Sequence, residues 1–146
     1  MSQPADTDAD RALIEAARDA IRRNYDAEGE RHTVGAAVLC ASGRTYVGVN
    51  VYSIHGSCAE FIALGAAITA GERDFVALVS VRGADGEESL APCGNCPQML
   101  AGYAPDCDVI VPTESRTAKV KASDLLPYAY ESSRDARCRE RPATPG

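Results

Sequence analysis

Two short cysteine motifs, each at the start of an expected helix, constrain this chain more than any other feature. In the first, Cys58 lies two residues before Glu60, and in the second, Pro92 precedes the C-x-x-C pair of Cys93 and Cys96. The gap within the pair lets both sulfurs bind one metal ion, and proline suits the first position of a helix. If both helices start at the same end of a sheet, three thiolates converge. Three protein ligands leave the fourth tetrahedral position open, as in catalytic zinc sites.

Apolar periodicity predicts the elements that carry these motifs. The pattern favours helices over residues 8–25, from 57 to a stop at Gly71, and over 92–101; short apolar runs indicate strands over 33–40, 45–50, 75–83, 108–112 and 117–121. We expect residues 1–7 to be disordered and residues 84–89 to form a polar loop. Strands that alternate with helices are typical of an α/β fold in which crossover connections build a mixed sheet.

The length of 146 residues is that of one domain, which we place at residues 1–131, followed by a charged tail at 132–146 that we expect to be disordered. No apolar run approaches the roughly 18 residues of a membrane span, and the polar, acidic start is unlike a signal peptide. We therefore expect a cytoplasmic protein with no membrane partner, whose clustered cysteines stay reduced and indicate metal binding or catalysis. The net charge of −6 argues against a nucleic-acid partner, which would need a basic channel.

In this order along the chain, the segments VGAAVL, GRTYVGVNV, CAE and APCGNC resemble the cytidine deaminase superfamily, over about residues 10–130. Either cysteine motif alone would be weak, but the two together, in order and each at a helix start, are specific. The resemblance implies a three-layer α/β/α fold with a five-stranded mixed sheet, and Zn²⁺ held by Cys58, Cys93 and Cys96. It also implies zinc-dependent hydrolytic deamination of a cytosine nucleoside or analogue, in which activated water attacks C4 of the ring.

The resemblance assigns roles to further residues. Glu60 is the catalytic proton shuttle between water, ring N3 and the leaving ammonia, while the N–H of Ala59 and the carbonyl of Ala91 bond the reacting groups. Relatives often carry arginine directly after the glutamate and after the last cysteine, where this chain has Phe61 and Pro97. Without those arginines, three thiolates weaken zinc as a Lewis acid unless helix dipoles or another arginine compensate. Relatives are homotetramers, so we expect a homotetramer here.

The segment before the first cysteine motif separates two substrate classes. Cytidine deaminases typically read Asn-Val-Glu, whose Asn and Glu hold a ribose hydroxyl, whereas this chain reads Asn50-Val51-Tyr52 before a shorter loop. The change removes a charged acceptor and, with Tyr130 in the ending LLPYAY, resembles the blasticidin S deaminase type. We favour a small, nucleoside-like substrate of the blasticidin S type that contacts Asn50, Tyr52 and Tyr130. The alternative is a cytidine or deoxycytidine deaminase of pyrimidine salvage, with Tyr52 as a packing residue.

Two histidines near the same segments have open roles. His32 lies where relatives have an aromatic residue that packs on the base, so it either stacks on a pyrimidine or serves only the start of its strand. His55 either faces the substrate or caps the helix that follows it.

The second cysteine motif has alternative interpretations from a different functional class. Cys93 and Cys96 would also fit a thioredoxin-like redox pair or a non-catalytic zinc-binding protein with a closed site. The redox interpretation leaves Cys58 and Glu60 unexplained. A closed site needs a fourth ligand, and the remaining cysteines and histidines are not at ligand spacing.

Overall fold

The computed structural model describes residues 2–135, in which helices alternate with strands. In chain order the elements are β1 (Gln3–Pro4), α1 (Asp8–Arg22), β2 (Val34–Cys40), β3 (Thr45–Val49), α2 (Ala59–Thr69), β4 (Phe75–Arg82), β5 (Glu88–Leu90), α3 (Asn95–Tyr103), β6 (Asp108–Pro112), β7 (Thr117–Lys121) and a 3₁₀ turn (Ala122–Leu125). The helices and the longer strands lie where the sequence predicts them. α1 ends earlier than expected, and α3 starts later.

One mixed sheet runs through the molecule in the order β1-β7-β6-β4-β2-β3, and β5 pairs with β4 beside this path. β4 and β6 are parallel, and the remaining pairs are antiparallel. The expected strands form the continuous series β3-β2-β4-β6-β7, which confirms the mixed sheet. Because β1 and β5 extend it, the sheet has 7 strands rather than the five that we expected.

The two extra strands come from segments that we expected to be irregular. Gln3 and Pro4 pair with Lys119 and Ala118 of β7, and Ser89 of β5 lies opposite Val81 of β4. With 2 and 3 residues, these strands are too short to show an alternating pattern. Their pairing depends on the open edges that the longer strands offer, and this information is not local in the sequence.

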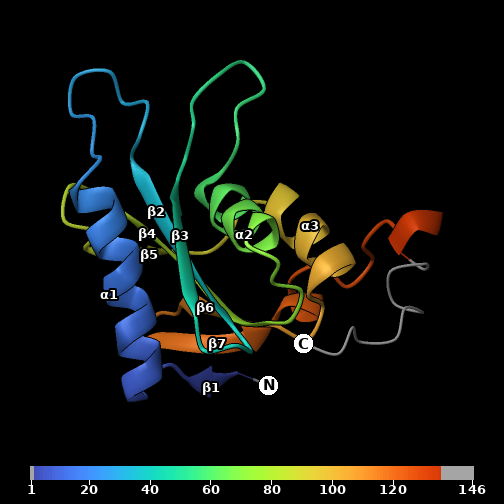
Figure 1. Cartoon of the computed structure of the whole chain (residues 1–146). Helices are drawn as coiled ribbons and strands as arrows, with labels where there is room; N and C mark the ends of the chain where they lie inside the picture. The colour runs from blue at the N-terminus through green and yellow to red at the C-terminus, as the bar shows by residue number, and fades with distance from the viewer. Residues whose placement is uncertain (1, 136–146) are drawn as a thin grey trace.

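Helices cover both faces of the sheet, with α1 on one face and α2 and α3 on the other (Figure 1). The side chains of β4 alternate accordingly: Leu78 lies in the core under α2 and α3, and Val79 lies in the core under α1. On α1, the buried residues Leu13, Ala17 and Ile21 recur at helical spacing and face the sheet. The three-layer α/β/α prediction is therefore confirmed.

Gly48 allows α2 to lie directly on β3. A Cβ atom at Gly48 would lie 2.5 Å from the backbone nitrogen of Ala63 and 2.9 Å from the carbonyl oxygen of Ala59. Both contacts are with helix backbone, which cannot move aside as a flexible side chain can, so only glycine fits. Because Ala59 is the first residue of α2, this contact sets the position of the helix end that carries the first cysteine motif.

The described chain ends in the segment that we expected to be a disordered tail. Its first residues form a helical turn in which the Asp135 carboxylate accepts hydrogen bonds from the Ser132 N–H (2.9 Å) and hydroxyl (2.7 Å). The rest of that tail, 136–146, lies outside the described residues. Between residues 2 and 135, no helix has the length and apolar character that crossing a bilayer requires.

Candidate active site and metal centre

The three cysteines of the two motifs converge. The sulfur of Cys58 lies 3.3 Å from that of Cys93, which lies 3.6 Å from that of Cys96, and all three sulfurs are within 4.8 Å of one another. Zn–S bonds of about 2.3 Å in a tetrahedron place sulfurs about 3.8 Å apart, so the three sulfurs are near the spacing that zinc requires. Soft thiolate donors in this arrangement fit a zinc ion with one open position.

Two helix starts on the same face of the sheet produce this convergence. The helix that we expected from residue 57 begins at Ala59, with Cys58 as its N-cap residue, and the Cys58 side chain makes no capping hydrogen bond. Cys96 lies in the first turn of α3, whereas Cys93 precedes the helix. α3 therefore begins after Pro92, which does not occupy the first helical position that we expected for it. The sulfur of Cys93 consequently lies just outside α3, close to the amino ends of α2 and α3.

Burial and neighbouring charges separate the three thiols electrostatically. Burial, followed by the hydrogen bond to Cys93, raises the pKa of Cys58, and burial, followed by the negative charge of Glu60, raises the pKa of Cys96. At Cys93 burial acts in the same direction, but hydrogen bonds from Cys58 and from the N–H groups of Cys96 and Asn95 together lower its pKa. Thiolates at Cys58 and Cys96 would therefore need a nearby cation to stabilise them, and zinc binding would release protons from these thiols.

Glu60 lies in the first turn of α2, with its carboxyl group beside the cysteines. The side chain is 4% exposed, and its Oε1 accepts a hydrogen bond of 2.5 Å from the hydroxyl of Ser80 on β4. Ser80 is a polar residue in an otherwise apolar buried strand, and we did not single it out from the sequence. A hydroxyl in the middle of such a strand was the available signal, because a buried hydroxyl needs a partner.

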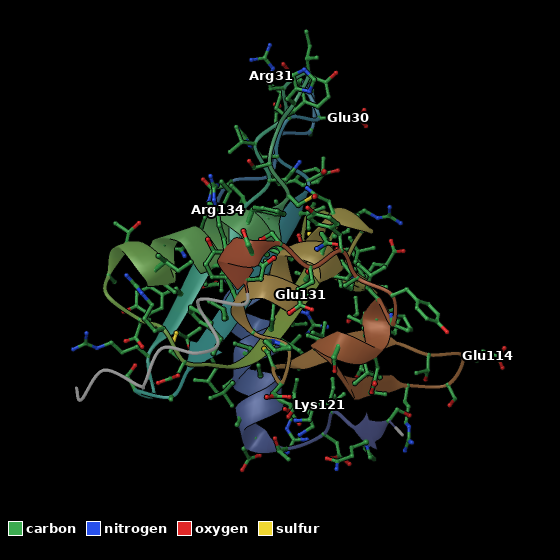
Figure 2. The ribbon with its side chains drawn as sticks, turned by 90° about the vertical axis from the view of Figure 1, so that its right-hand side faces the viewer. Glu30, Arg31, Glu114, Lys121, Glu131 and Arg134 are labelled. Atoms are coloured by element: carbon green, nitrogen blue, oxygen red, sulfur yellow. The ribbon has the colours of Figure 1, made fainter. Side chains whose placement is uncertain are left out.

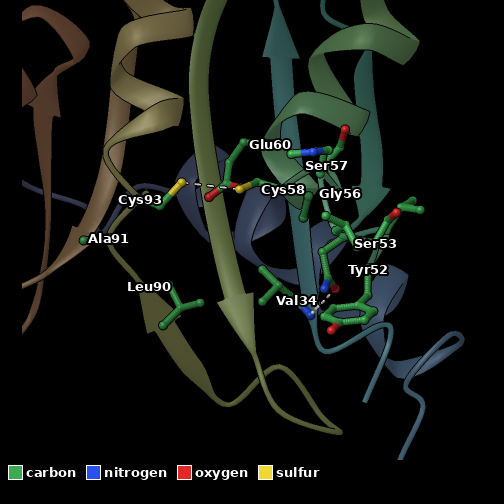
Figure 3. Close-up of a pocket in the computed structure, with 15 residues that line it drawn as sticks. Val34, Tyr52, Ser53, Gly56, Ser57, Cys58, Glu60, Leu90, Ala91 and Cys93 are labelled. Atoms are coloured by element: carbon green, nitrogen blue, oxygen red, sulfur yellow. Dashed lines mark hydrogen bonds between the residues drawn. The ribbon is translucent and has the colours of Figure 1, made fainter. Parts of the chain in front are cut away.

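A cavity of about 390 Å³ opens onto this cluster. Its lining includes Val34, residues 50–60, Leu90, Ala91 and Cys93. Figure 3 shows Cys58, Glu60 and Cys93 together at one end of the cavity and Tyr52 at the other. Two of the three sulfur-bearing residues therefore face the cavity, and a metal held by them would be open to a ligand there. The volume is that of a site for a small molecule.

Asn50 lines the cavity, but its amide group also bonds to the protein backbone. Its Oδ1 accepts hydrogen bonds from the N–H groups of Thr33 (2.8 Å) and Val34 (3.0 Å). Its Nδ2 donates to the carbonyl of Arg31 at 3.3 Å. Asn50 thus ties the end of β3 to the start of β2, and Nδ2 keeps one hydrogen for a ligand.

His32 belongs to the same junction and not to the cavity lining. Its Nδ1 lies 2.7 Å from the carbonyl oxygen of Asn50, which can only accept, so Nδ1 carries a proton. The ring therefore serves the start of β2 in this chain. Just before it, Glu30 and Arg31 lie at the tip of the long loop between α1 and β2, at the far end of the molecule (Figure 2).

The remaining expected contacts divide between those that reach the cavity and one that does not. Tyr52, His55, Ala59 and Ala91 line it. No hydrogen bond among the described residues joins the His55 ring to α2, so the capping role is not seen. Tyr130 is 74% exposed and does not line the cavity of its own chain; its backbone exchanges two hydrogen bonds with the Gln98 side chain, of 2.6 and 2.9 Å. Leu90 of the unexpected strand β5 lines the cavity instead.

A three-layer α/β/α fold with three convergent cysteines and a buried glutamate at one cavity defines a zinc-dependent deaminase. Residues 7–111 match a family model described as the cytidine and deoxycytidylate deaminase zinc-binding region. The chain therefore belongs to the cytidine and deoxycytidylate deaminase family, and its cofactor is zinc. Membership excludes the thioredoxin-like interpretation of the C-x-x-C pair.

Individual relatives include both substrate types that we considered. The chain is 33% identical to a blasticidin-S deaminase from Bacillus cereus over 130 residues, which span 83% of this chain and 91% of that protein. It is 42% identical to a cytidine deaminase from Sporosarcina psychrophila over 106 residues, 66% of this chain and 74% of that protein.

Solved structures of cytidine deaminases have the same fold. The enzyme from Burkholderia pseudomallei superposes with a TM-score of 0.68 at 34% identity, covering 82% of this chain and 98% of that one. The enzyme from Mycobacterium tuberculosis superposes with a TM-score of 0.70 at 29% identity, covering 87% and 100%. The likeness extends over nearly the whole of both neighbours.

Proposed function

We propose that this enzyme deaminates a free cytosine nucleoside or nucleoside analogue, and that it prefers a blasticidin S-type molecule to cytidine. The observation that carries the proposal is Tyr52 at the mouth of the cavity. It is 71% exposed and lines the cavity, and in the motif that resembles cytidine deaminases it replaces the Glu that holds a ribose hydroxyl. The likeness to the Bacillus cereus blasticidin-S deaminase over 83% of this chain supports the same substrate class.

The other polar groups near Tyr52 support this preference. The amide oxygen of Asn50 already accepts hydrogen bonds from two backbone N–H groups, so Asn50 can offer a ligand only a donor hydrogen from its Nδ2. The one carboxylate in the lining belongs to Glu60, beside the cysteines at the opposite end. An ordinary ribose, whose hydroxyl groups donate, finds no strong acceptor near Tyr52. A modified sugar that brings its own acceptor groups meets the donors of Asn50 and Tyr52.

The roles of the residues around the reacting amine are those that the resemblance implies, and the positions of these residues at the cavity support them. Cys58, Cys93 and Cys96 would hold the zinc ion, which when bound supplies Lewis-acid activation of water near neutral pH. Glu60 would take one proton from the attacking water and pass it to ring N3. It would then take the proton of the resulting hydroxyl group at C4 and deliver it to the amine, which leaves as ammonia. The N–H of Ala59, in the first turn of α2, has no acceptor within its helix and donates to the reacting oxygen. The carbonyl of Ala91 accepts from the amine.

A free nucleoside, rather than a nucleotide or a nucleic-acid strand, matches the charge of the cavity. The lining residues include no lysine or arginine, and His55 is the only basic side chain among them. A phosphate group would enter such a site without a partner that neutralises it.

A second candidate function is the deamination of cytidine or deoxycytidine in pyrimidine salvage. Its support is the 42% identity with the Sporosarcina psychrophila cytidine deaminase. In that case Tyr52 is a packing residue in the place of the sugar-binding carboxylate, and it does not increase the affinity for any other substrate.

We also propose a homotetramer in which a neighbouring subunit completes the cavity. The loop of residues 51–56, which forms one wall, exposes 93% of the Ile54 surface to solvent. Tyr128 and Tyr130 are likewise exposed in the single chain. Large apolar side chains left in water are typical of surfaces that another subunit covers.

Ammonia release on cytidine, deoxycytidine, cytosine and blasticidin S, measured side by side, tests the substrate proposal. Glu60→Ala provides the blank. Turnover of blasticidin S in clear excess over the nucleosides supports the proposal, and turnover mainly of cytidine favours the salvage function. Tyr52→Glu should then shift the ratio of kcat/KM toward cytidine by about tenfold, since a hydrogen bond to a charged group contributes about 1.5–3 kcal/mol. Tyr52→Phe keeps the ring but removes the donor, so it should lower kcat/KM on blasticidin S without raising kcat/KM on cytidine. Unchanged ratios in Tyr52→Glu would mean that residue 52 does not face the sugar.

A further inference from the structure

The contact between Ser80 and Glu60 is unusual for the interior of this fold. Among residues 2–135, three polar or charged residues are buried, and two of them, Glu60 and Ser80, bond to each other. Ser80 is 1% exposed and lies between Val79 and Val81, which face the α1 core. Its side chain points to the opposite face, toward α2. The sheet thus supplies a hydroxyl donor at the place where the Glu60 carboxylate enters the core under α2.

The hydrogen bond distinguishes the two oxygens of Glu60. Oε1 accepts from the Ser80 hydroxyl at 2.5 Å, a length typical of a hydroxyl bonded to a carboxylate. No other hydrogen bond to the Glu60 side chain is found in the described chain. No buried side-chain oxygen or nitrogen there lacks a partner, so Oε2 must be accessible. Since Glu60 lines the cavity, Oε2 is the oxygen that faces it.

We propose that Ser80 is a positioning residue for catalysis: it fixes the Glu60 carboxylate so that Oε2 alone carries protons in the cavity. The inference rests on the proposed role of Glu60 as proton shuttle. The last torsion angle of a glutamate side chain has broad minima, so an unbonded carboxylate can rotate about it. A shuttle that serves water, ring N3 and ammonia in turn must keep one oxygen within reach of all three. The Ser80 hydroxyl removes that rotational freedom at a fixed point of β4.

A purely structural role for the same hydrogen bond predicts a different outcome. Satisfying a buried carboxylate would stabilise the fold, and its loss would lower the unfolding midpoint without changing turnover per folded, zinc-loaded molecule. A positioning role predicts a fall in kcat at nearly unchanged KM, because binding of the ring does not depend on which way the carboxylate is turned. Measuring kcat and KM separately therefore distinguishes the positioning role from the structural role.

The experiment compares Ser80→Thr with Ser80→Val. Thr and Val have nearly the same shape, so both add the same bulk to the buried site, but only Thr retains the hydroxyl. With zinc content per chain measured first, we expect Thr to keep kcat within about twofold of the wild type and Val to lose about tenfold, with KM within about twofold in both. Ser80→Ala, which adds no bulk, should show the same loss as Val and covers the case in which Val does not fold.

Glu60→Ala, assayed in parallel, distinguishes failure of this inference from failure of the proposed function. If Glu60→Ala abolishes turnover while Val and Ala at position 80 turn over as Thr does, Ser80 is only structural and the inference is overturned. If Glu60→Ala retains wild-type turnover, the proton-shuttle role fails and the Ser80 proposal fails with it. Loss in Glu60→Ala, Ser80→Val and Ser80→Ala, with Thr close to wild type, supports both.

Discussion

Substituting Asn50 with alanine tests whether this residue holds the cavity wall together. Its Oδ1 accepts from the N–H groups of Thr33 and Val34, and its Nδ2 donates to the Arg31 carbonyl. Asn50→Ala removes all three hydrogen bonds at the junction between β3 and β2. Tyr52 lies two residues further along the same wall, so the wall should loosen as well.

The stability change can be worked out from these contacts. The two N–H groups lose their acceptor at a half-buried strand start, and each such bond contributes about 1 kcal/mol net. The longer bond to Arg31, at 3.3 Å, adds little. We therefore expect Asn50→Ala to lower the free energy of unfolding by about 2 kcal/mol, which in a domain of this size lowers Tm by about 6 °C.

Asn50→Asp is the matched control. A carboxylate can accept from both N–H groups, so it should retain more stability than alanine, although it replaces the donor to the Arg31 carbonyl with an acceptor. Urea unfolding followed by circular dichroism, on zinc-loaded protein, measures both variants. If Asn50→Ala unfolds within about 0.5 kcal/mol of the wild type, or if Asp loses as much as Ala, the two acceptor bonds do not hold this junction.

Two further predictions concern the metal and the assembly. The purified protein should contain about one zinc per chain, and Cys93→Ala should lose most of both zinc and activity because only Cys58 and Cys96 remain; metal analysis that finds full zinc in that variant would require a different ligand set. Light scattering should give the mass of a tetramer, and Tyr130→Ala should lower kcat/KM about tenfold without unfolding its own chain, since Tyr130 lies on the surface there. A monomer with full activity would contradict the shared cavity.

The metal centre was predictable from sequence because the C-x-x-C pair is a local signal and the resemblance to the deaminase superfamily joins Cys58 to that pair, 35 residues from Cys93. Thiol ligands at the spacing of Cys93 and Cys96, together with Cys58 before an apolar helix, restrict the geometry strongly. The longer strands were predictable for a similar reason, since each carries enough apolar residues to show its period. The short strands β1 and β5 were not, because their pairing depends on edges supplied by distant segments.

The contacts around the metal centre were harder to predict because a side chain of one type can form hydrogen bonds either with a substrate or with the protein itself. Asn50 was assigned to the substrate, and the structure shows that most of its hydrogen-bonding capacity goes to the backbone. His32 bonds to the Asn50 carbonyl, which matches the structural alternative for that residue. Ser80 was missed because its partner, Glu60, is 20 residues away and only the fold brings them together.

The absence of arginine after Glu60 and after Cys96 connects the metal centre to the Ser80 inference. With Phe61 and Pro97 at those positions, the pKa of Cys93 is lowered by hydrogen bonds from the Cys58 thiol and from the N–H groups of Cys96 and Asn95. Backbone N–H groups carry partial charges rather than a full one, so three thiolates leave zinc more negative than an arginine-flanked site would. If a zinc ion bound here were the weaker Lewis acid, the rate would depend more on proton transfer, and hence on the placement of Glu60. We therefore expect Ser80→Val to reduce kcat more in this chain than the matching change would in an enzyme with arginine at both positions.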